Sequence, residues 1–233
     1  MGVIATAAAG TALAGLGTAL HGAYYRNSFV FGEPVTHLRT RERAVALTFD
    51  DGPNPVATPA ILDALGARGV KATFFILGRH AKQWPALVRR VVDEGHVVAN
   101  HGFYHRKLHI RTPGYVRTDL ELGTQMIVEA CGVHPLWFRA PHGFRSPWVT
   151  SIAKSLGQRT VGWSLGVWDS ARPGVDAIVT RTISGARPGA ILLLHDGDGY
   201  DDAGDRMQTA QAIPGIIDRL HESGYRFSLL DAA

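Results

Sequence analysis

Residues 44–53 read AVALTFDDGP and join an apolar strand to two adjacent carboxylates. The run 44–49 is rich in residues that favour strands, and Gly52 and Pro53 are typical of a turn. Two aspartates at the end of an apolar strand are costly unless a cation or hydrogen-bond donors compensate them. A plain polar turn is the alternative interpretation. The stretch predicts a buried strand whose end opens into a polar site.

On both sides of this stretch, short apolar runs alternate with segments of helical periodicity, which favours parallel strands joined by helices. The Thr58-Pro59 pair indicates a helix start directly after the turn. The expected strands cover residues 44–50, 70–77, 96–100, 136–139, 159–164, 190–195 and 225–229. About seven such units predict an α/β fold, a (β/α) barrel somewhat short of the eight-unit form.

The N-terminal part of the chain differs from the rest in composition. Residues 1–20 contain no charged side chain and are about long enough for a membrane-spanning helix, so we expect a membrane anchor or signal-like helix there. A small-residue helix packed on the domain and a mis-assigned start are the alternatives. Residues 21–43 lose periodicity and are predicted to be a linker, so the catalytic domain is expected to cover 44–233.

Charge and cysteine content exclude some classes of protein. The net charge is +4 and no basic stripe is interleaved with aromatic residues, so no nucleic-acid partner is predicted. The single cysteine, Cys131, cannot form an intramolecular disulfide. No protein partner is predicted from these features.

Unusual polar residues collect at the ends of the predicted strands. His101 and His105 follow the third strand, and Arg139, Asp169 and His195 lie at or just after the fourth, fifth and sixth. Loops at this end of an α/β barrel converge, which predicts one pocket for all of them.

Two histidines four residues apart project from one face of a helical turn, although this spacing alone is a weak signal. With a strand-end aspartate they supply three ligands and leave a fourth position for water, as in hydrolytic zinc sites. Adjacent aspartates diverge, so one can bind a metal while its neighbour faces the water.

These motifs resemble the polysaccharide deacetylase family, whose catalytic unit is the NodB homology domain of carbohydrate esterase family 4. The resemblance covers nearly all of residues 44–231. It is carried by TFDDGP at 48–53, by the HxxxH of His101 and His105, by Arg139-Ala140-Pro141 and by Leu192-Leu193-Leu194-His195. It implies a deformed (β/α) barrel, a divalent metal and hydrolysis of an N-acyl group, usually acetyl, on an amino sugar.

The resemblance also implies a role for each motif residue. Asp50 would be the general base, held by Arg139, and His195 the general acid, tuned by Asp169. The implied metal ligands are Asp51, His101 and His105, a set that favours zinc and accepts cobalt or nickel. The implied substrate contacts are Pro141, His142, Trp168, Leu192 and Leu194, with the two leucines around the acyl methyl group and the main-chain N–H of His142 on the oxyanion.

The chain departs from the family at four positions. Gly102 stands where a serine or threonine normally tethers the loop, and His142 stands where an aromatic residue, commonly tyrosine, is usual. Residues 166–170, GVWDS, keep only the second aspartate of the DxxDW motif, with Gly166 and Ser170 replacing its ends. These changes affect the expected substrate pocket more than the expected reaction.

Residues 196–205, DGDGYDDAGD, carry five aspartates. A solvated acidic loop is expected there, and a calcium site is the alternative, although the spacing lacks the pattern of an EF-hand.

The leading hypothesis is a metal-dependent hydrolase that removes an N-acetyl group from an amino-sugar poly- or oligosaccharide. A deformylase or amidase acting on a lipid-linked sugar or a non-sugar amide is the second hypothesis, and a catalytically inactive carbohydrate-binding protein is the third. We expect membrane association through residues 1–20 and a place in a bacterial cell envelope. The basic residues that follow this segment favour the cytoplasmic side, whereas the family resemblance favours the outer side.

Overall fold

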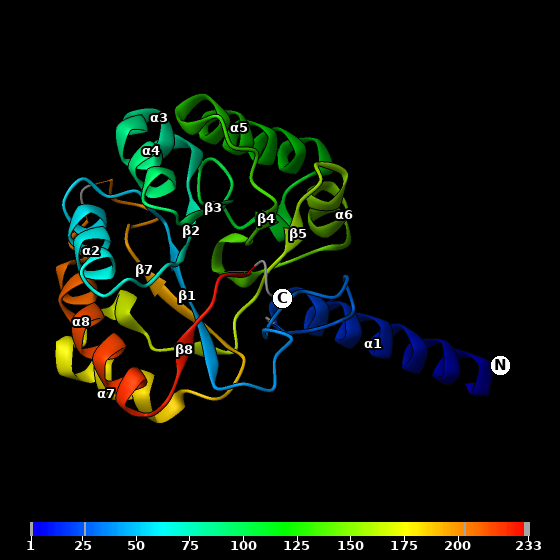
Figure 1. Ribbon diagram of the computed structural model, residues 1–233. Helices are drawn as coiled ribbons and strands as arrows, with labels where there is room; N and C mark the ends of the chain where they lie inside the picture. Colours follow the sequence, from blue (N-terminus) through cyan, green and yellow to red (C-terminus); the bar gives the residue numbers. More distant parts are fainter. Residues whose placement is uncertain (1, 26, 203, 231–233) are drawn as a thin grey trace.

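The computed structural model describes residues 2–25, 27–202 and 204–230. Its centre is one parallel sheet in the order β5-β4-β3-β2-β1-β7-β6, with β8 paired to the start of β1. The sheet curls into a half-barrel with helices around it, as the sequence predicts (Figure 1). The strands are β1 (Ala44–Asp50), β2 (Thr73–Ile76), β3 (Val97–Asn100), β4 (Trp137–Phe138), β5 (Arg159–Thr160), β6 (Leu165–Gly166), β7 (Ala190–His195) and β8 (Arg226–Phe227).

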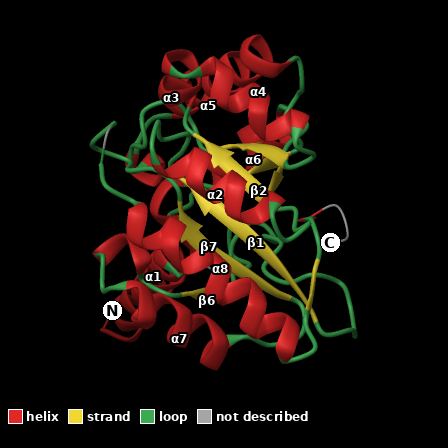
Figure 2. Cartoon of the chain, turned by 60° about the vertical axis from the view of Figure 1, so that its left-hand side comes forward, coloured by secondary structure: helices red, strands yellow, loops and turns green. Residues whose placement is uncertain are grey.

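Helices cover the outer side of the curled sheet, and Figure 2 shows them around the strands. They are α2 (Ala57–Gly66), α3 (Gly78–Gln83), α4 (Pro85–Asp93), α5 (Pro113–Cys131), α6 (Pro147–Ser155), α7 (Val175–Gly185) and α8 (Met207–Glu222), with short 3-10 turns η1 (Leu108–Ile110), η2 (Pro141–Gly143) and η3 (Asp169–Ala171).

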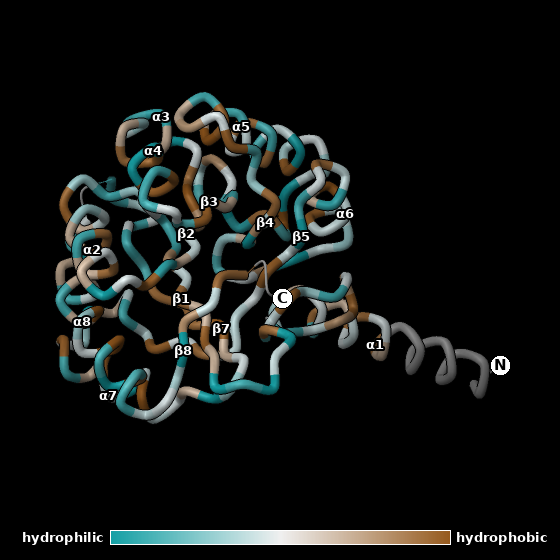
Figure 3. The backbone as a smooth tube through the Cα atoms, viewed as in Figure 1, coloured by the Kyte–Doolittle hydropathy of each residue, from teal (hydrophilic) through white to brown (hydrophobic). Residues whose placement is uncertain are grey.

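Strand periodicity separates the two faces of the sheet. Along β1, Val45, Leu47 and Phe49 belong to the large core that also contains the apolar faces of the surrounding helices. The alternate residues Ala44 and Ala46 belong to a second cluster. Because successive side chains point to opposite faces, Thr48 and Asp50 lie on the face of the alanines. Figure 3 shows that the central strands are mainly hydrophobic.

The segment predicted to be a linker contributes to the sheet. Val35 forms a parallel bridge with Val161, and His37 forms an antiparallel bridge with Ala190. Leu38 is buried, and its N–H donates to the carbonyl oxygen of Gly189 at 2.8 Å. Residues 35–38 therefore span from the β5 side of the sheet to the start of β7.

Residues 2–24 form helix α1 (Gly2–Tyr24), which projects from the body of the molecule in Figure 1. Its end is attached to the domain, since the N–H of Arg145 donates to the carbonyl oxygen of Ala23 at 3.1 Å and the ring of Tyr24 packs edge-on against Phe144. No helix in the described part of the chain combines the length and hydropathy that a membrane crossing needs. Membrane association of residues 1–20 stays a prediction.

Two local expectations are corrected. Helix α2 begins at Ala57, before Thr58, and the side-chain oxygen of Asn54 accepts the N–H groups of Val56 and Ala57 at 2.9 and 2.8 Å. The hydroxyl of Thr58 instead donates to Asp196 at 2.6 Å. The short strand β6 was not predicted, because its two residues, Leu165 and Gly166, give no periodic signal.

Candidate active site

The register of the sheet brings the two expected proton-transfer residues together. Asp50 is the last residue of β1 and pairs in parallel register with His195, the last residue of β7. Asp51 follows with a left-handed backbone (φ 72°), so the chain turns sharply after Asp50. The two carboxylates nevertheless converge on one imidazole, since Nε2 of His101 lies 3.8 Å from Oδ2 of Asp50 and 3.2 Å from Oδ1 of Asp51, which corrects the expectation that they diverge.

Asp50 is held by a buried arginine from the end of β4. Nη1 of Arg139 lies 2.6 Å from Oδ1 of Asp50, and Nη2 donates to the carbonyl oxygen of Gly162 at 2.8 Å. The guanidinium carbon lies 4.0 Å from the centre of the Phe75 ring. Arg139 is fully buried, and burial lowers the pKa of its guanidinium. A buried pair of this kind fixes one oxygen of Asp50 and leaves the other available.

The three predicted metal ligands lie close together: Asp51, His101 and His105. Oδ1 of Asp51 lies 3.2 Å from Nε2 of His101 and 3.1 Å from Nε2 of His105. Among the residues that the structure describes, these three form a group whose ligand atoms all lie within 4.8 Å of one another. All three side chains are buried.

The surroundings of the cluster suit a divalent cation. Nδ1 of His101 faces the carbonyl oxygen of Arg139 at 2.8 Å, so Nε2 carries the free lone pair. Oδ1 of Asp51 is buried without a hydrogen-bond donor in the described structure. Burial opposes ionisation of Asp51, but His105 and His101 hold the pKa of this carboxyl well below its ordinary value. The site thus offers one carboxylate and two imidazoles, a donor set suited to zinc.

The main chain of Asp51 has a partner that sequence reasoning missed. Nδ1 of the buried His80 lies 2.7 Å from the carbonyl oxygen of Asp51, and its Nε2 lies 3.0 Å from Oδ1 of Asp202. No partner for His80 could be identified from the sequence, because both contacts join residues far apart in the chain. His80 fixes the backbone of the aspartate that is expected to bind the metal.

His195 is paired with Asp169 as expected. Nδ1 of His195 lies 2.9 Å from Oδ1 of Asp169, and the main-chain N–H of His195 donates to Oδ2 at 2.7 Å. The hydroxyl of Thr209 also donates to Oδ2 at 2.9 Å and fixes the carboxylate. Burial disfavours the charged imidazole, but Asp169 outweighs burial and raises the pKa of His195 to about 9. This arrangement keeps His195 protonated at neutral pH and leaves Nε2 free.

The expectation for Leu192 and Leu194 is wrong. Both side chains are fully buried in the large core between the sheet and its helices. His195 is an odd-numbered residue of β7, and alternation places Ile191 and Leu193 on its face and the even-numbered leucines on the other. The half-buried Leu193 is therefore the leucine beside His195.

The loop that carries His101 and His105 is tethered without the missing hydroxyl. Asp119 of α5 accepts the N–H groups of Phe103 and Tyr104 at 3.0 and 3.2 Å. Gly102 has φ +75°, and a Cβ there would overlap the carboxylate of Asp119. Glycine at this position and Asp119 together replace the tether that a serine or threonine would give.

His142 and Pro141 lie beside the metal cluster on the turn η2. Pro141 is buried, and the ring of His142 lies 4.6 Å from that of His105. His142 has a left-handed backbone (φ 62°), and burial with the nearby His105 lowers the pKa of its imidazole to about 4. A neutral ring at this position borders the site.

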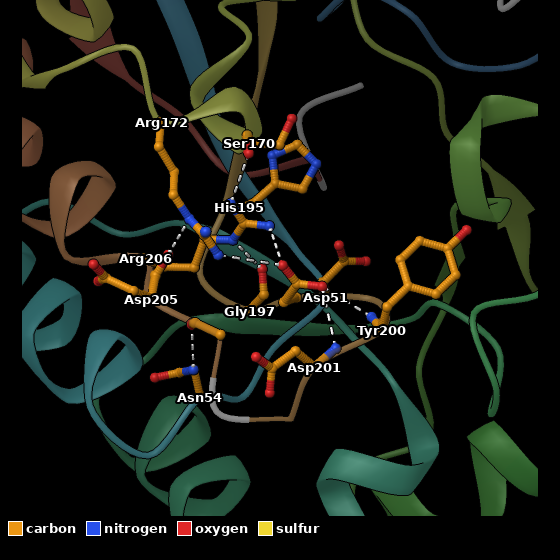
Figure 4. Close-up of polar contacts among 12 residues, drawn as sticks. Asp51, Asn54, Ser170, Arg172, His195, Gly197, Tyr200, Asp201, Asp205 and Arg206 are labelled. Atoms are coloured by element: carbon orange, nitrogen blue, oxygen red, sulfur yellow. Dashed lines mark hydrogen bonds and ion pairs between the residues drawn. The ribbon is translucent and has the colours of Figure 1, made fainter.

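The acidic loop is well packed, in contrast to the solvated loop that we expected. Asp198 forms an ion pair with Arg206. Asp202 forms an ion pair with Arg79 and also contacts Nε2 of His80. The carboxylate of Asp205 accepts the N–H of Met207. Figure 4 shows Arg206, Tyr200, Asp201 and Asp205 of this part of the chain near Asp51 and His195. In the described part of the chain no group of metal-ligating residues is found in this loop, so nothing supports the calcium alternative.

Comparisons with known proteins agree with this geometry. The profile of the family described as polysaccharide deacetylase matches residues 37–161. The chitooligosaccharide deacetylase of Rhizobium leguminosarum bv. trifolii is 40% identical over 206 residues, which are 86% of this chain and 96% of that protein.

Solved structures share the same fold. A peptidoglycan N-acetylglucosamine deacetylase in complex with 4-naphthalen-1-yl-N-oxidanyl-benzamide has a TM-score of 0.78 at 30% identity, over 85% of this chain and 91% of that one. A pseudoenzyme of the same esterase family from Bacillus anthracis has a TM-score of 0.77 at 28% identity, over 85% of this chain and 67% of that one. The chain therefore belongs to the polysaccharide deacetylase family, within carbohydrate esterase family 4.

Proposed function

We propose that the protein is a metal-dependent N-deacetylase of glycans that contain N-acetylglucosamine, such as chitooligosaccharides or the glycan strands of peptidoglycan. One observation carries the proposal: the Asp50–Arg139 pair, the Asp51–His101–His105 cluster and the His195–Asp169 pair converge at one end of the sheet. The substrate classes come from the names of the similar deacetylases.

Asp51, His101 and His105 would hold the metal, with zinc the first expectation and cobalt or nickel as substitutes. A divalent ion bound there supplies an activated water near neutral pH and polarises the acyl oxygen.

Asp50 acts as the general base. Its Oδ1 is occupied by Arg139, and its Oδ2 lies 3.8 Å from Nε2 of His101, so the free oxygen faces the metal cluster. This oxygen takes the proton that the attacking water loses. The guanidinium of Arg139 fixes the direction of the carboxylate through a charge-assisted hydrogen bond.

His195 acts as the general acid. Its Nδ1 is held by Asp169, and Nε2 gives its proton to the nitrogen that leaves from the acyl group. The main-chain N–H of His142 is the proposed donor to the acyl oxygen. An acid and a base in their expected places argue against a protein that only binds carbohydrate, although the same fold includes a pseudoenzyme.

The test is acetate release from chitotetraose and from peptidoglycan fragments by the full chain. Activity should disappear with a chelator and return when zinc, cobalt or nickel is added, and Asp50→Asn should release little acetate with the same metal content. Release of formate from N-formyl analogues but no acetate from N-acetyl substrates would assign a deformylase instead. Full activity of exhaustively demetallated protein would refute metal dependence.

A further inference from the structure

Two large aromatic side chains are exposed at the edges of the site. Trp168 is 73% exposed and directly precedes Asp169, the partner of His195. Tyr200 is 66% exposed, and its ring lies 5.3 Å from that of His105 in a perpendicular arrangement. Trp168 is thus next in sequence to the partner of the proposed general acid, and the ring of Tyr200 lies against a predicted metal ligand. Tyrosine and tryptophan combine an apolar ring with a polar tip, which suits contact with a ligand at an exposed position.

Tyr200 is held in place although most of its ring is exposed. Its N–H donates to Oδ1 of Asp198 at 2.9 Å, and its hydroxyl lies 3.0 Å from Nε2 of His142. The preceding Gly199 packs directly against the ring of His105, where a Cβ would overlap the imidazole. The ring therefore has a fixed position before any ligand arrives, which lowers the entropy lost on binding.

Arg206 connects the loops that carry the two aromatic residues. Its guanidinium donates to the carbonyl oxygen of Gly197 at 2.7 Å and to Oδ2 of Asp198 at 2.8 Å, both in the Tyr200 loop. It also donates to the carbonyl oxygen of Ser170 at 3.0 Å, in the loop that follows Trp168. Figure 4 shows Arg206 between Ser170 and Gly197. The residue is 6% exposed, so these hydrogen bonds are shielded from water.

Arg172 forms a second connection between the same loops. Its Nε donates to the carbonyl oxygen of Asp205 at 3.0 Å, and its Nη2 lies 3.8 Å from Oδ2 of Asp198. Both arginines therefore act on Asp198, the residue that also receives the N–H of Tyr200.

We propose that Tyr200 contacts the sugar together with Trp168, and that Arg206 is a positioning residue that sets the distance between these two aromatic side chains. This inference rests on the proposed function and adds a substrate-specificity element to it. Pyranose rings present apolar C–H faces that pack on aromatic rings, while the polar tips of tyrosine and tryptophan remain able to form hydrogen bonds.

The first experiment measures binding separately from catalysis. Chitotetraose is titrated by calorimetry into zinc-loaded Asp50→Asn protein and into the same protein carrying Tyr200→Ala, Tyr200→Phe or Tyr25→Phe. An aromatic contact contributes about a two- to tenfold change in affinity. Tyr200→Ala should weaken binding by that factor, Tyr200→Phe by less because the ring remains, and the exposed control Tyr25→Phe should leave binding unchanged.

The second experiment uses kinetics of the otherwise unchanged protein. Tyr200→Ala should raise KM for chitotetraose while kcat and zinc content stay within about twofold, because a contact made equally in the ground and transition states affects KM alone. Arg206→Gln should raise KM in the same way. Its effect should largely vanish when Tyr200 and Trp168 are both replaced by alanine, because Arg206 acts through them.

Unchanged chitotetraose binding by Tyr200→Ala would overturn the inference. A fall in kcat and zinc content of Tyr200→Ala with KM unchanged would also overturn it, because Tyr200 would then support the metal site. Tyr200 is exposed, so its alanine variant tests the inference even if Arg206→Gln does not fold. If Asp50→Asn binds no chitotetraose and the unchanged protein releases no acetate, the proposed function has failed instead.

Discussion

Replacing Asp169 by asparagine tests whether the altered DxxDW segment still controls the general acid. The Asp169→Asn variant keeps the size of the side chain and a hydrogen-bond acceptor for Nδ1 of His195, while the negative charge is lost. Oδ2 accepts hydrogen bonds from Thr209 and from the N–H of His195, and the amide nitrogen of the variant, itself a donor, cannot accept them. The titration of His195 should therefore change through the loss of the charge and of one acceptor.

The expected size of the effect follows from the pKa of His195. Asp169 raises this pKa to about 9 against an ordinary value of 6.5, despite burial, which acts in the opposite direction. The difference corresponds to about 3 kcal/mol in favour of the protonated imidazole. Without the charge of Asp169, burial remains and only Asp51 and Asp50 still favour the charged ring, so the pKa of His195 should fall by about two units.

The assay is the pH dependence of kcat/KM for acetate release from chitotetraose between about pH 5 and pH 10. Because protonated His195 donates to the leaving nitrogen, activity should decline on the alkaline side near pH 9, and in Asp169→Asn this limb should move to about pH 7 or below. The acid limb belongs to Asp50 and should move much less. Asp218→Asn, which changes an exposed carboxylate paired with Arg68, is the matched control and should leave both limbs in place.

The free energy of unfolding should also depend on pH through the His195–Asp169 pair. A histidine whose pKa is higher in the folded state stabilises the fold fully below its unfolded value of about 6.5, and this contribution disappears as pH rises through about 9. The difference in free energy of unfolding between the unchanged protein and Asp169→Asn should therefore shrink from about pH 6 to about pH 10. An alkaline limb that stays near pH 9 in Asp169→Asn would refute the reasoning and mean that another group tunes His195.

Three further predictions concern other parts of the chain. Asp50→Asn should lose about 10²- to 10⁴-fold in kcat with normal zinc content, whereas Asp51→Asn should lose zinc itself; equal metal content in elemental analysis would show that the roles are assigned wrongly. Gly102→Ala should lower the free energy of unfolding by about 1–3 kcal/mol, measured by urea denaturation, because its backbone is left-handed and its Cβ would meet Asp119. Protein with residues 1–20 should sediment with membranes after a high-salt wash and protein that begins at Arg41 should not; release by salt alone would indicate only surface attraction.

The sequence predicted most of the fold because its signals are local. The seven expected strands all occur, and β1 has the predicted bounds, since an apolar run followed by Asp-Gly-Pro leaves little freedom in how the strand ends. The residues of the site could be predicted because each stands at the end of a parallel strand, where the topology forces convergence. The ligand set of Asp51, His101 and His105 is implied by the family resemblance, because two histidines four residues apart are by themselves a weak signal.

The contacts that could not be predicted join distant segments or depend on register. The family resemblance implies that Leu192 and Leu194 surround the acyl methyl group, whereas strand alternation in β7 places Leu193 on the face of His195. His80 contacts Asp202, which is 122 residues away in the sequence, and no local sequence pattern predicts such a pair. The same holds for Thr209 and Asp169, which are 40 residues apart.

The departures from the family pattern look independent in the sequence but have local replacements in the structure. Gly102 lacks the hydroxyl that serine or threonine would provide, and the carboxylate of Asp119 holds the same loop by accepting two main-chain N–H groups. His142 replaces an aromatic side chain, and Tyr200 supplies an aromatic ring beside it through a hydrogen bond. Ser170 and Gly166 depart from the fourth motif, yet Asp169 still pairs with His195 and is also held by Thr209. Because the Tyr200 side chain contacts His142 and His105, a change at Tyr200 should alter substrate affinity before it alters the chemistry of Asp50 and His195.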